Sequence, residues 1–225
     1  FILDPNTPTT MLAGGGSLWR STDVCTAAMP AWTQIHSGVA SVVVAIAVAK
    51  TDSNIIWVAY QNGAVYKTAN GLAATPTWTQ VATVPAGSKQ RIYVDRTNAR
   101  RVYLGLTGFT GNKLYATSDG GGSWSALTGL PAATVFAIEA HPANPSWLYV
   151  GTAVGLFASQ DGGATWGASN EGPANVQVRD LGWYSETGNS AELLVATFGR
   201  GIWRTTVITG SGPLLSVSKA GAGSG

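Results

Sequence analysis

The chain has 225 residues, of which 11% are charged, and its formal net charge is +2. The basic residues form no run that would indicate a nucleic-acid surface, and no stretch reaches the roughly 18 apolar residues that a membrane span needs. The single cysteine, Cys25, excludes an intrachain disulfide and a cysteine-based zinc site, while His36 and His141 are isolated, so neither a metal site nor a cofactor is expected. An average soluble domain has about a quarter of its residues charged. The neutral, polar surface implied here favours a secreted or cell-surface bacterial protein.

Short strands rich in β-branched and aromatic residues follow one another from the N-terminus, in five sets. The longest apolar run, Val42 to Ala49, predicts a buried strand in the second set. The fourth set shows the pattern most clearly, with strands over 135–140, 147–152 and 156–159 and a weaker fourth strand at Trp166. No segment has a sustained 3.6-residue period, so almost no helix is expected.

One turn sequence recurs between the third and fourth strands of these sets. Residues 117–124 and 159–166 share the order hydroxyl, any residue, Asp, Gly, Gly, any residue, hydroxyl, Trp. Looser copies contain Asp23 and Asn70, and a fifth register, at Val207, lacks the acid. The five positions are 47, 49, 42 and 46 residues apart, and a period of this size indicates a repeat architecture.

Sets of four strands at this period predict an all-β fold, a β-propeller of about five four-stranded blades. The predicted blades span residues 1–38, 39–86, 87–132, 133–174 and 175–207, and residues 208–225 are expected to form a linker and the start of a following module. Small residues at matched positions of the second strands predict close packing near the propeller axis: Gly14, Ala59, Gly105, Gly151 and Ala196.

The repeated turn is interpreted as a structural device. Its Asp can accept hydrogen bonds from nearby backbone N–H groups, its glycines can adopt positive φ, and its Trp can lie against the neighbouring blade. An acid that occurs once per blade in the same turn is not expected to be catalytic or to bind calcium. The residues given this structural role are Asp23, Asn70, Asp119, Trp124, Asp161 and Trp166.

The turn resembles the Asp-box, or bacterial neuraminidase repeat, of sialidases, xyloglucanase-type glycosidases, sortilin and photosystem assembly propellers. The fourth repeat is most similar to the blades of xyloglucanase-type double propellers. The resemblance implies a ligand site around the axis, on the face away from the Asp-boxes, and propellers of six or seven blades more often than five. Whether five blades close here, or belong to a larger propeller, stays open. Residues 215–225 resemble the opening of a repeat module of large secreted bacterial proteins.

Catalysis within this chain is not expected. The arginine triad of sialidases is not matched, because Arg20 and Arg204 share a repeat position with Lys67. A glycosidase needs two carboxylates roughly 5 to 9.5 Å apart, and the candidates outside the turns are Glu139, Glu171 and Asp180. Asp180 follows Arg179 at the start of a strand, where a structural ion pair is the simpler interpretation.

The preferred site consists of aromatic, amide and charged residues in the second loops and at the start of the last blade. They are Tyr60, Gln61, Asn62, Phe109, Asn112, Arg179, Asp180, Phe198 and Arg200. Aromatic rings stack on sugars, and Tyr, Phe and Arg are also frequent at protein interfaces. The sequence therefore predicts a non-catalytic module that binds a polysaccharide, a cell-surface glycan or a protein partner. A scaffold propeller and a fragment of a glycoside hydrolase, with its catalytic acids mostly outside this chain, are the alternatives.

Overall fold

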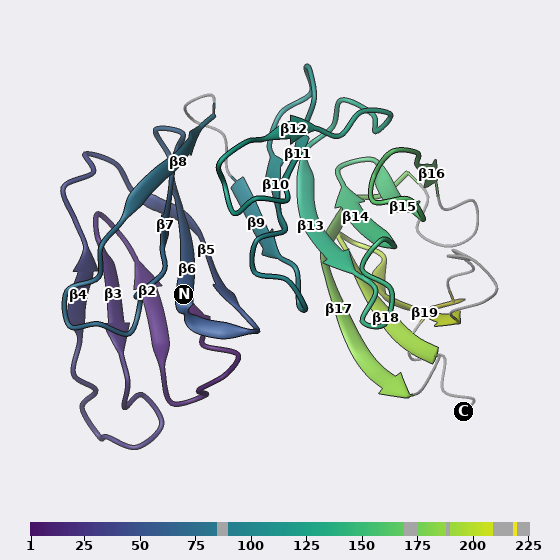
Figure 1. Cartoon of the computed structure of the whole chain (residues 1–225). Helices are drawn as coiled ribbons and strands as arrows, with labels where there is room; N and C mark the ends of the chain where they lie inside the picture. Colours follow the sequence, from purple (N-terminus) through teal and green to yellow (C-terminus); the bar gives the residue numbers. More distant parts are fainter. Residues whose placement is uncertain (85–89, 169–174, 188–189, 209–217, 220–225) are drawn as a thin grey trace. The chain divides into compact units, whose positions relative to one another are not determined.

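The structure of the chain is a computed structural model that describes residues 1–84, 90–168, 175–187, 190–208 and 218–219. These residues form five antiparallel four-stranded sheets and contain no helix (Figure 1). The expectation of an all-β chain in five sets of four strands is confirmed. No membrane-spanning helix and no cluster of three or more metal-ligating side chains occurs in this described part.

The strands of each sheet lie side by side in chain order. The first sheet contains β1 (Ile2–Leu3), β2 (Met11–Gly14), β3 (Leu18–Ser21) and β4 (Thr33–His36). The second contains β5 (Val43–Ala49), β6 (Asp52–Tyr60), β7 (Ala64–Thr68) and β8 (Thr79–Thr83). The third contains β9 (Gln90–Val94), β10 (Val102–Leu106), β11 (Leu114–Thr117) and β12 (Ser125–Ala126). The fourth contains β13 (Val135–Ala140), β14 (Leu148–Thr152), β15 (Gly155–Ser159) and β16 (Gly167–Ala168), and the fifth contains β17 (Val178–Thr187), β18 (Ser190–Thr197), β19 (Gly201–Ile208) and β20 (Ser218–Lys219).

The fourth strands of the third and fourth sheets are the shortest strands of their sheets. β12 and β16 have two residues each and begin directly after Trp124 and Trp166. β20 lies in the segment expected to open a following module, and in the structure it pairs with Trp203 and Arg204 of β19. The rest of that segment, from residue 209, lies outside the described residues.

The chain divides into two compact units, and the division passes through the third sheet. The first unit comprises Phe1–Leu104 and Ala116–Ser125, and the second comprises Gly105–Tyr115 and Ala126–Gly225. Each unit contains two complete sheets and part of the third.

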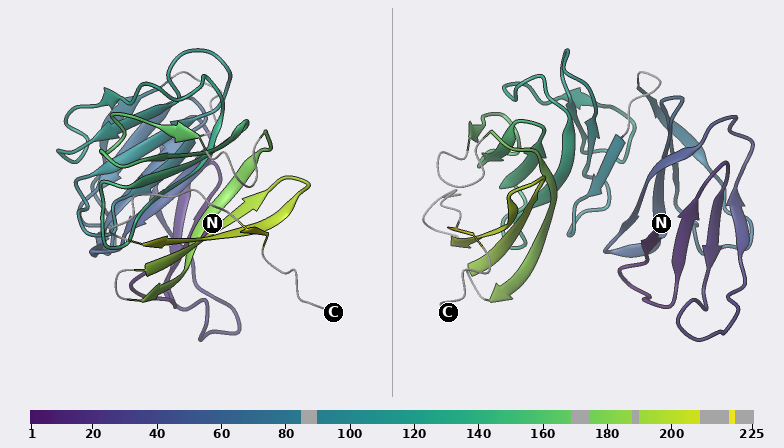
Figure 2. Two further views of the ribbon diagram at one scale, coloured as in Figure 1. Left: turned by 90° about the vertical axis from the view of Figure 1, so that its right-hand side faces the viewer. Right: turned by 180° about the vertical axis from the view of Figure 1, so that it is seen from behind.

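The core of the first unit forms between the faces of the first and second sheets (Figure 2). Leu12 and Leu18 project from the first sheet and pack with Ile56 and Val58 of the second. All four are at most 2% exposed, and alternation along each strand places their sequence neighbours on the opposite face. Burying side chains of this size contributes about 1.5–3 kcal/mol each.

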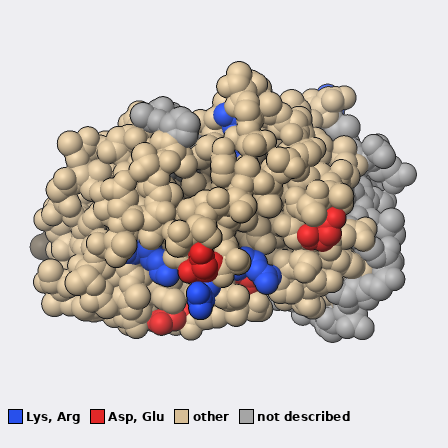
Figure 3. Space-filling view, turned by 45° about the horizontal axis from the view of Figure 1, so that its top comes forward, with Lys and Arg blue, Asp and Glu red and all other residues tan. Residues whose placement is uncertain are grey.

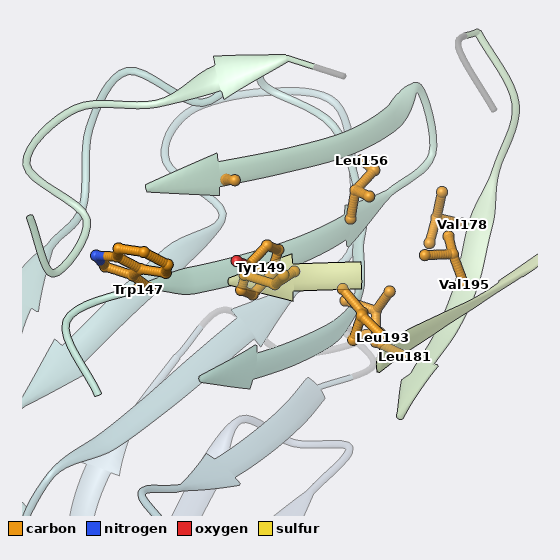
Figure 4. Close-up of a cluster of buried hydrophobic side chains, with 10 residues drawn as sticks. Trp147, Tyr149, Leu156, Val178, Leu181, Leu193 and Val195 are labelled. Carbon is orange, nitrogen blue, oxygen red and sulfur yellow. The ribbon is translucent and has the colours of Figure 1, made fainter. Parts of the chain in front are cut away.

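The core of the second unit repeats this arrangement between the fourth and fifth sheets. Tyr149 on β14 lies beside Leu181 and Leu193, and Val178 lies beside Val195 (Figure 4). The same kinds of side chain therefore meet between sheets in both units, as expected when one repeat supplies each interface.

Glycines on the second strands allow the next sheet to come close. A Cβ atom added at Gly14, Gly105 or Gly151 would lie only 2.5, 2.5 or 2.7 Å from a side-chain atom of the first strand of the following sheet. Those atoms belong to Val43, Val135 and Val178. The crowding predicted at the matched small residues is thus present at these three positions.

Candidate functional site

The order of the strands places two kinds of connection at opposite ends of every sheet. The turns between the third and fourth strands, which carry the repeated acid and are here called the Asp turns, lie at one end. The turns between the second and third strands lie at the other end, together with the starts of the first strands, and this end is here called the second-turn edge. The residues predicted to bind a ligand belong to this second edge.

The acids of the two strong Asp turns are fully engaged in holding the turn. Asp119 Oδ1 accepts hydrogen bonds from Thr117 Oγ1 at 2.7 Å and from the Ser123 N–H at 3.0 Å, and its Oδ2 accepts from Ser123 Oγ at 2.7 Å. Asp161 makes the same three bonds with Ser159 and Thr165, at 2.8, 2.9 and 2.6 Å. The two glycines after each acid have positive φ, between 73° and 98°.

The weaker copies keep the two hydrogen bonds to Oδ1, one from the hydroxyl residue before the turn and one from a backbone N–H after it. Asp23 Oδ1 accepts from Ser21 Oγ at 2.7 Å and from the Ala31 N–H at 3.1 Å. Asn70 Oδ1 accepts from Thr68 Oγ1 at 2.8 Å and from the Thr77 N–H at 2.9 Å. An amide can therefore replace the acid here, because only an acceptor oxygen is required.

Tryptophans after these turns contact the preceding sheet. The Trp78 indole N–H donates to the Ile35 carbonyl at 2.7 Å, and that of Trp124 donates to the Val81 carbonyl at 3.2 Å. Trp166 lies close to Gly129, which follows the preceding sheet's last strand. These contacts tie the Asp turns of the second, third and fourth sheets to the preceding sheet.

The Asp turns predict a loss of stability in acid. Hydrogen bonds from Thr117 and Ser123 hold the pKa of Asp119 well below its ordinary value of about 4, and bonds from Thr165 and Ser159 do the same for Asp161. The folded state thus binds fewer protons than the unfolded state, so the contribution of both groups is present above about pH 4 and is lost as pH falls below it. We expect a protein with both Asp119→Asn and Asp161→Asn to show a shallower fall of melting temperature between pH 5 and pH 2 than the wild type, measured by circular dichroism. Parallel curves for the two proteins would contradict this.

At the second-turn edge of the second unit, Arg179 lies between two phenylalanine rings. Its guanidinium carbon is 4.3 Å from the centre of the Phe136 ring and 5.3 Å from the centre of the Phe198 ring. Both distances lie within the range of a cation–π interaction. Arg179 is exposed and Phe198 is 67% exposed, so the three side chains, here called the Arg179 cluster, form a surface that a ligand can reach.

Two β-bulges orient the side chains of Phe136 and Arg179. The register of β13 against β14 shifts between Val135 and Ala137, and the register of β17 against β18 shifts between Val178 and Asp180. Phe136 and Arg179 are the extra residues at these two shifts, and a bulge redirects the side chain that it inserts. Phe136 is not among the residues predicted from the sequence, although Val135-Phe136-Ala137 aligns with Val178-Arg179-Asp180.

Backbone hydrogen bonds hold the turns beside the starts of the first strands. The Phe198 N–H donates to the Gln177 carbonyl at 2.9 Å, which keeps Phe198 next to Arg179. Thr197 Oγ1 donates to the Gly201 carbonyl at 2.6 Å and closes the turn that carries Phe198 and Arg200. The Gly108 N–H donates to Thr134 Oγ1 at 2.9 Å and anchors the turn that carries the 67% exposed Phe109. These hydrogen bonds fix the turns of Phe109 and Phe198, so the second-turn edge of the second unit is preorganised for binding.

The remaining predicted residues are distributed more widely. Asn112 and Arg200 are exposed in the turns with Phe109 and Phe198, and Asp180 is exposed with its Oδ1 accepting from the Leu181 N–H at 3.1 Å. Gln61 and Asn62 are exposed in the first unit, where the Asn62 N–H donates to Ser41 Oγ at 2.9 Å.

Tyr60 is a correction to the sequence analysis. Its side chain is fully buried, and its hydroxyl lies 2.7 Å from His36 Nδ1. Burial raises the pKa of Tyr60 to about 12. The ring packs between the first and second sheets, and because it is buried there it cannot serve as a surface for a ligand. Tyr60 is the last residue of β6 and not part of the turn that follows.

The two candidate acids that the structure describes lie at different ends of their strands. Glu139 lies near the end of β13 that leads away from the second-turn edge, opposite Tyr149, while Asp180 lies beside Arg179 at that edge. Glu171 lies outside the described residues.

Known proteins of similar structure are propellers. No protein-family profile and no curated protein matches the chain by sequence. A GH74 enzyme from Niastella koreensis matches with a TM-score of 0.70 and 17% identity, over 96% of this chain and 30% of that one. The GH74 xyloglucanase of Xanthomonas campestris matches with a TM-score of 0.62 and 16% identity, over 90% of this chain and 35% of that one. YCF48 bound to a D1 peptide matches with a TM-score of 0.58 and 15% identity, over 97% and 68% of the two chains.

The chain has a β-propeller fold. At these identities the likeness shows the fold alone, and the chain spans about a third of the length of the GH74 enzymes. The sheets described above are its blades, and the prediction of propeller blades is confirmed.

Proposed function

We propose that the chain is a non-catalytic β-propeller module that binds an uncharged polysaccharide at the Arg179 cluster. The carrying observation is the guanidinium held between Phe136 and Phe198 on an exposed edge. The apolar ring faces offer stacking area to a sugar ring, and the guanidinium supplies N–H donors for hydroxyl groups. Phe109 and Asn112, on the second turn of the third blade, extend this surface with a further ring and an amide.

The composition supports an uncharged ligand and an extracellular location. Only 11% of the residues are charged, and the face in Figure 3 shows few Lys, Arg, Asp or Glu side chains. A highly charged polymer would need a strong electrostatic potential from clustered charges of the opposite sign, and a surface with so few charges does not provide one. We place the module on the outside of a bacterial cell. We interpret its Asp turns as Asp-boxes, because the same three hydrogen bonds occur around Asp119 and around Asp161.

The test is a binding measurement on neutral polysaccharides, xyloglucan among them, by affinity electrophoresis and calorimetry. We expect Phe198→Ala and Arg179→Gln each to weaken binding about tenfold or more, because each removes part of the cluster. Tyr184→Ala is the matched control, since Tyr184 is a 70% exposed aromatic residue on the same strand as Arg179. Binding that is absent, or that is unchanged in both variants, would refute the proposal.

A protein ligand is the second candidate, since Phe and Arg are enriched at protein interfaces and the structurally similar YCF48 is bound to a peptide. A peptide array probed with the wild type and Phe198→Ala separates the two. A peptide signal lost in the variant, without any polysaccharide signal, would favour a protein partner.

A glycoside hydrolase fragment is the third candidate, supported by the likeness to GH74 enzymes. Release of reducing ends from xyloglucan by the wild type, lost in Asp180→Asn or Glu139→Gln, would replace the binding module by an enzyme.

A further inference from the structure

The turns between the first and second strands of the first, third and fourth blades share one geometry. They span residues 4–10, 95–101 and 141–147, and they are here called the first turns. In each of them the N–H of the first residue donates to the carbonyl of the seventh, at 2.8 or 2.9 Å. The N–H of the seventh residue donates to the carbonyl of the fourth, also at 2.8 or 2.9 Å. The first residue of each first turn therefore occupies an equivalent, repeated position.

In two of these turns the first residue is an aspartate that accepts hydrogen bonds from the backbone just after it. Asp4 Oδ1 accepts from the Asn6 N–H at 2.8 Å. Asp95 Oδ1 accepts from the Thr97 and Asn98 N–H groups, at 2.8 and 3.1 Å. Both aspartates are at most 3% exposed, so these bonds satisfy N–H groups that water reaches poorly.

In the fourth blade a histidine holds this position. His141 Nδ1 accepts from the N–H groups of Ala143 and Asn144, both at 3.2 Å, and the side chain is 2% exposed. An imidazole nitrogen accepts only through its lone pair, so Nδ1 carries no proton here and the neutral ring is protonated at Nε2. Protonation of Nδ1 would make it a donor that faces two other donors inside the protein. The closed turn is therefore compatible only with neutral His141.

The 141–147 turn connects three parts of the second unit. The His141 ring lies edge-on between two indoles, with ring centres 5.4 Å from Trp147 and 5.2 Å from Trp183 of β17. The Trp183 indole N–H donates to the Ala140 carbonyl at 2.9 Å, which ties the fifth blade to the residue before the turn. The Gly162 N–H, in the Asp turn of the fourth blade, donates to the carbonyl of residue 146 at 2.8 Å. Opening of the turn would therefore disturb both contacts.

The other titratable groups on the elements around His141 keep their charge between pH 7.5 and pH 5. Carboxyl groups titrate near pH 4 and tyrosine hydroxyls near pH 10. The groups concerned are Glu139 on β13, Tyr149 on β14, Asp161 in the adjacent Asp turn, and Arg179 and Asp180 at the start of β17. Burial raises the pKa of Tyr149, and the hydrogen bonds of the Asp turn lower that of Asp161, so both shifts lead away from this range. Among these groups only the histidine titrates within it.

We propose that the 141–147 turn is a pH-sensitive switch, closed when His141 is neutral and open when it is protonated. In the open form the imidazolium leaves the two indoles for water, and the Ala143 and Asn144 N–H groups bind water instead. The open form takes up a proton near pH 6.5, as an exposed histidine does, and the closed form excludes it. The closed turn is thus favoured above about pH 6.5, and opening increases as pH falls below it. The switch is independent of polysaccharide binding.

The test is amide hydrogen exchange, measured by NMR on the full chain at pH 7.5 and pH 5. Each rate is corrected for the pH dependence of exchange in an unstructured peptide. We expect the Ala143 and Asn144 amides to lose about thirtyfold of their protection at pH 5, because protonation near pH 6.5 favours the open form by that factor. The Thr97 and Asn98 amides are the internal control, since a carboxylate accepts their hydrogen bonds in the equivalent turn. Their protection should stay constant.

A His141→Asp variant separates the switch from a general effect of acid. It installs the residue type that the first and third blades use, so the turn should stay closed and protection should be equal at both pH values. His141→Asn also offers an acceptor oxygen without titrating, and it replaces the first variant if that one does not fold. Wild-type protection that does not change with pH would overturn the proposal. An equal loss at Thr97 and Asn98, or in the folded variant, would do the same.

Discussion

Replacing Trp57 by alanine is expected to lower the free energy of unfolding by about 3–5 kcal/mol. The side chain is fully buried, with the Trp124 ring centre at 6.1 Å and the Lys67 ammonium 5.3 Å from its own ring centre. The truncation thus leaves a large cavity where the second blade, its basic side chain and the next Asp turn meet. Few rearrangements can fill this cavity, because the surrounding groups are held by the hydrogen bonds of the repeat.

Urea denaturation followed by far-ultraviolet circular dichroism measures this loss without depending on tryptophan fluorescence. Trp32→Ala is the matched control, since Trp32 is 40% exposed and its truncation should cost no more than about 0.5 kcal/mol. Equal losses in the two variants would show that the interface around Trp57 does not carry the stability assigned to it.

Replacing Gly105 by alanine is expected to destabilise the protein by about 1–3 kcal/mol through overpacking. The added Cβ atom would lie 2.5 Å from Val135 Cγ1 and 3.0 Å from Val135 Cβ. The fourth blade would therefore have to move away from the third blade. The nearest atoms all belong to the side chains of Val135 and Ile138, which makes the clash removable.

A double-mutant cycle with Val135→Ala tests this cause. The second change alone costs stability, but in the Gly105→Ala background it should cost much less, since it makes room for the new methyl group. Gly167→Ala is the control, because no atom lies within 4 Å of its added Cβ. Strictly additive losses for Gly105→Ala and Val135→Ala would reject steric crowding as the cause.

The candidate site was predictable in part. Arg179 and Phe198 were found because the repeat aligns strand starts and second turns between blades, and the structure brings these two side chains together. Phe136 was missed because a bulge is a mismatch between two paired strands, which one strand's sequence does not reveal. Tyr60 was assigned wrongly, because its position at a strand end is compatible with both burial and exposure. Its contact with His36, 24 residues earlier in the chain, decides for burial.

The Asp turn shows what the sequence alone determined about this protein. Its hydrogen bonds join residues no more than four positions apart in the strong copies, and its glycines adopt their conformation locally. Local chemistry of this kind is visible in one stretch of sequence, and its recurrence sets the period, the strand order and the class of fold. Tertiary structure alone decided which side chains meet between blades and which stay uncovered. Leu18 and Ile202 occupy the same repeat position, yet one is buried and the other is 51% exposed. The physical reason is that burial depends on whether another sheet packs over the position. The type of residue and its place in the repeat do not determine this.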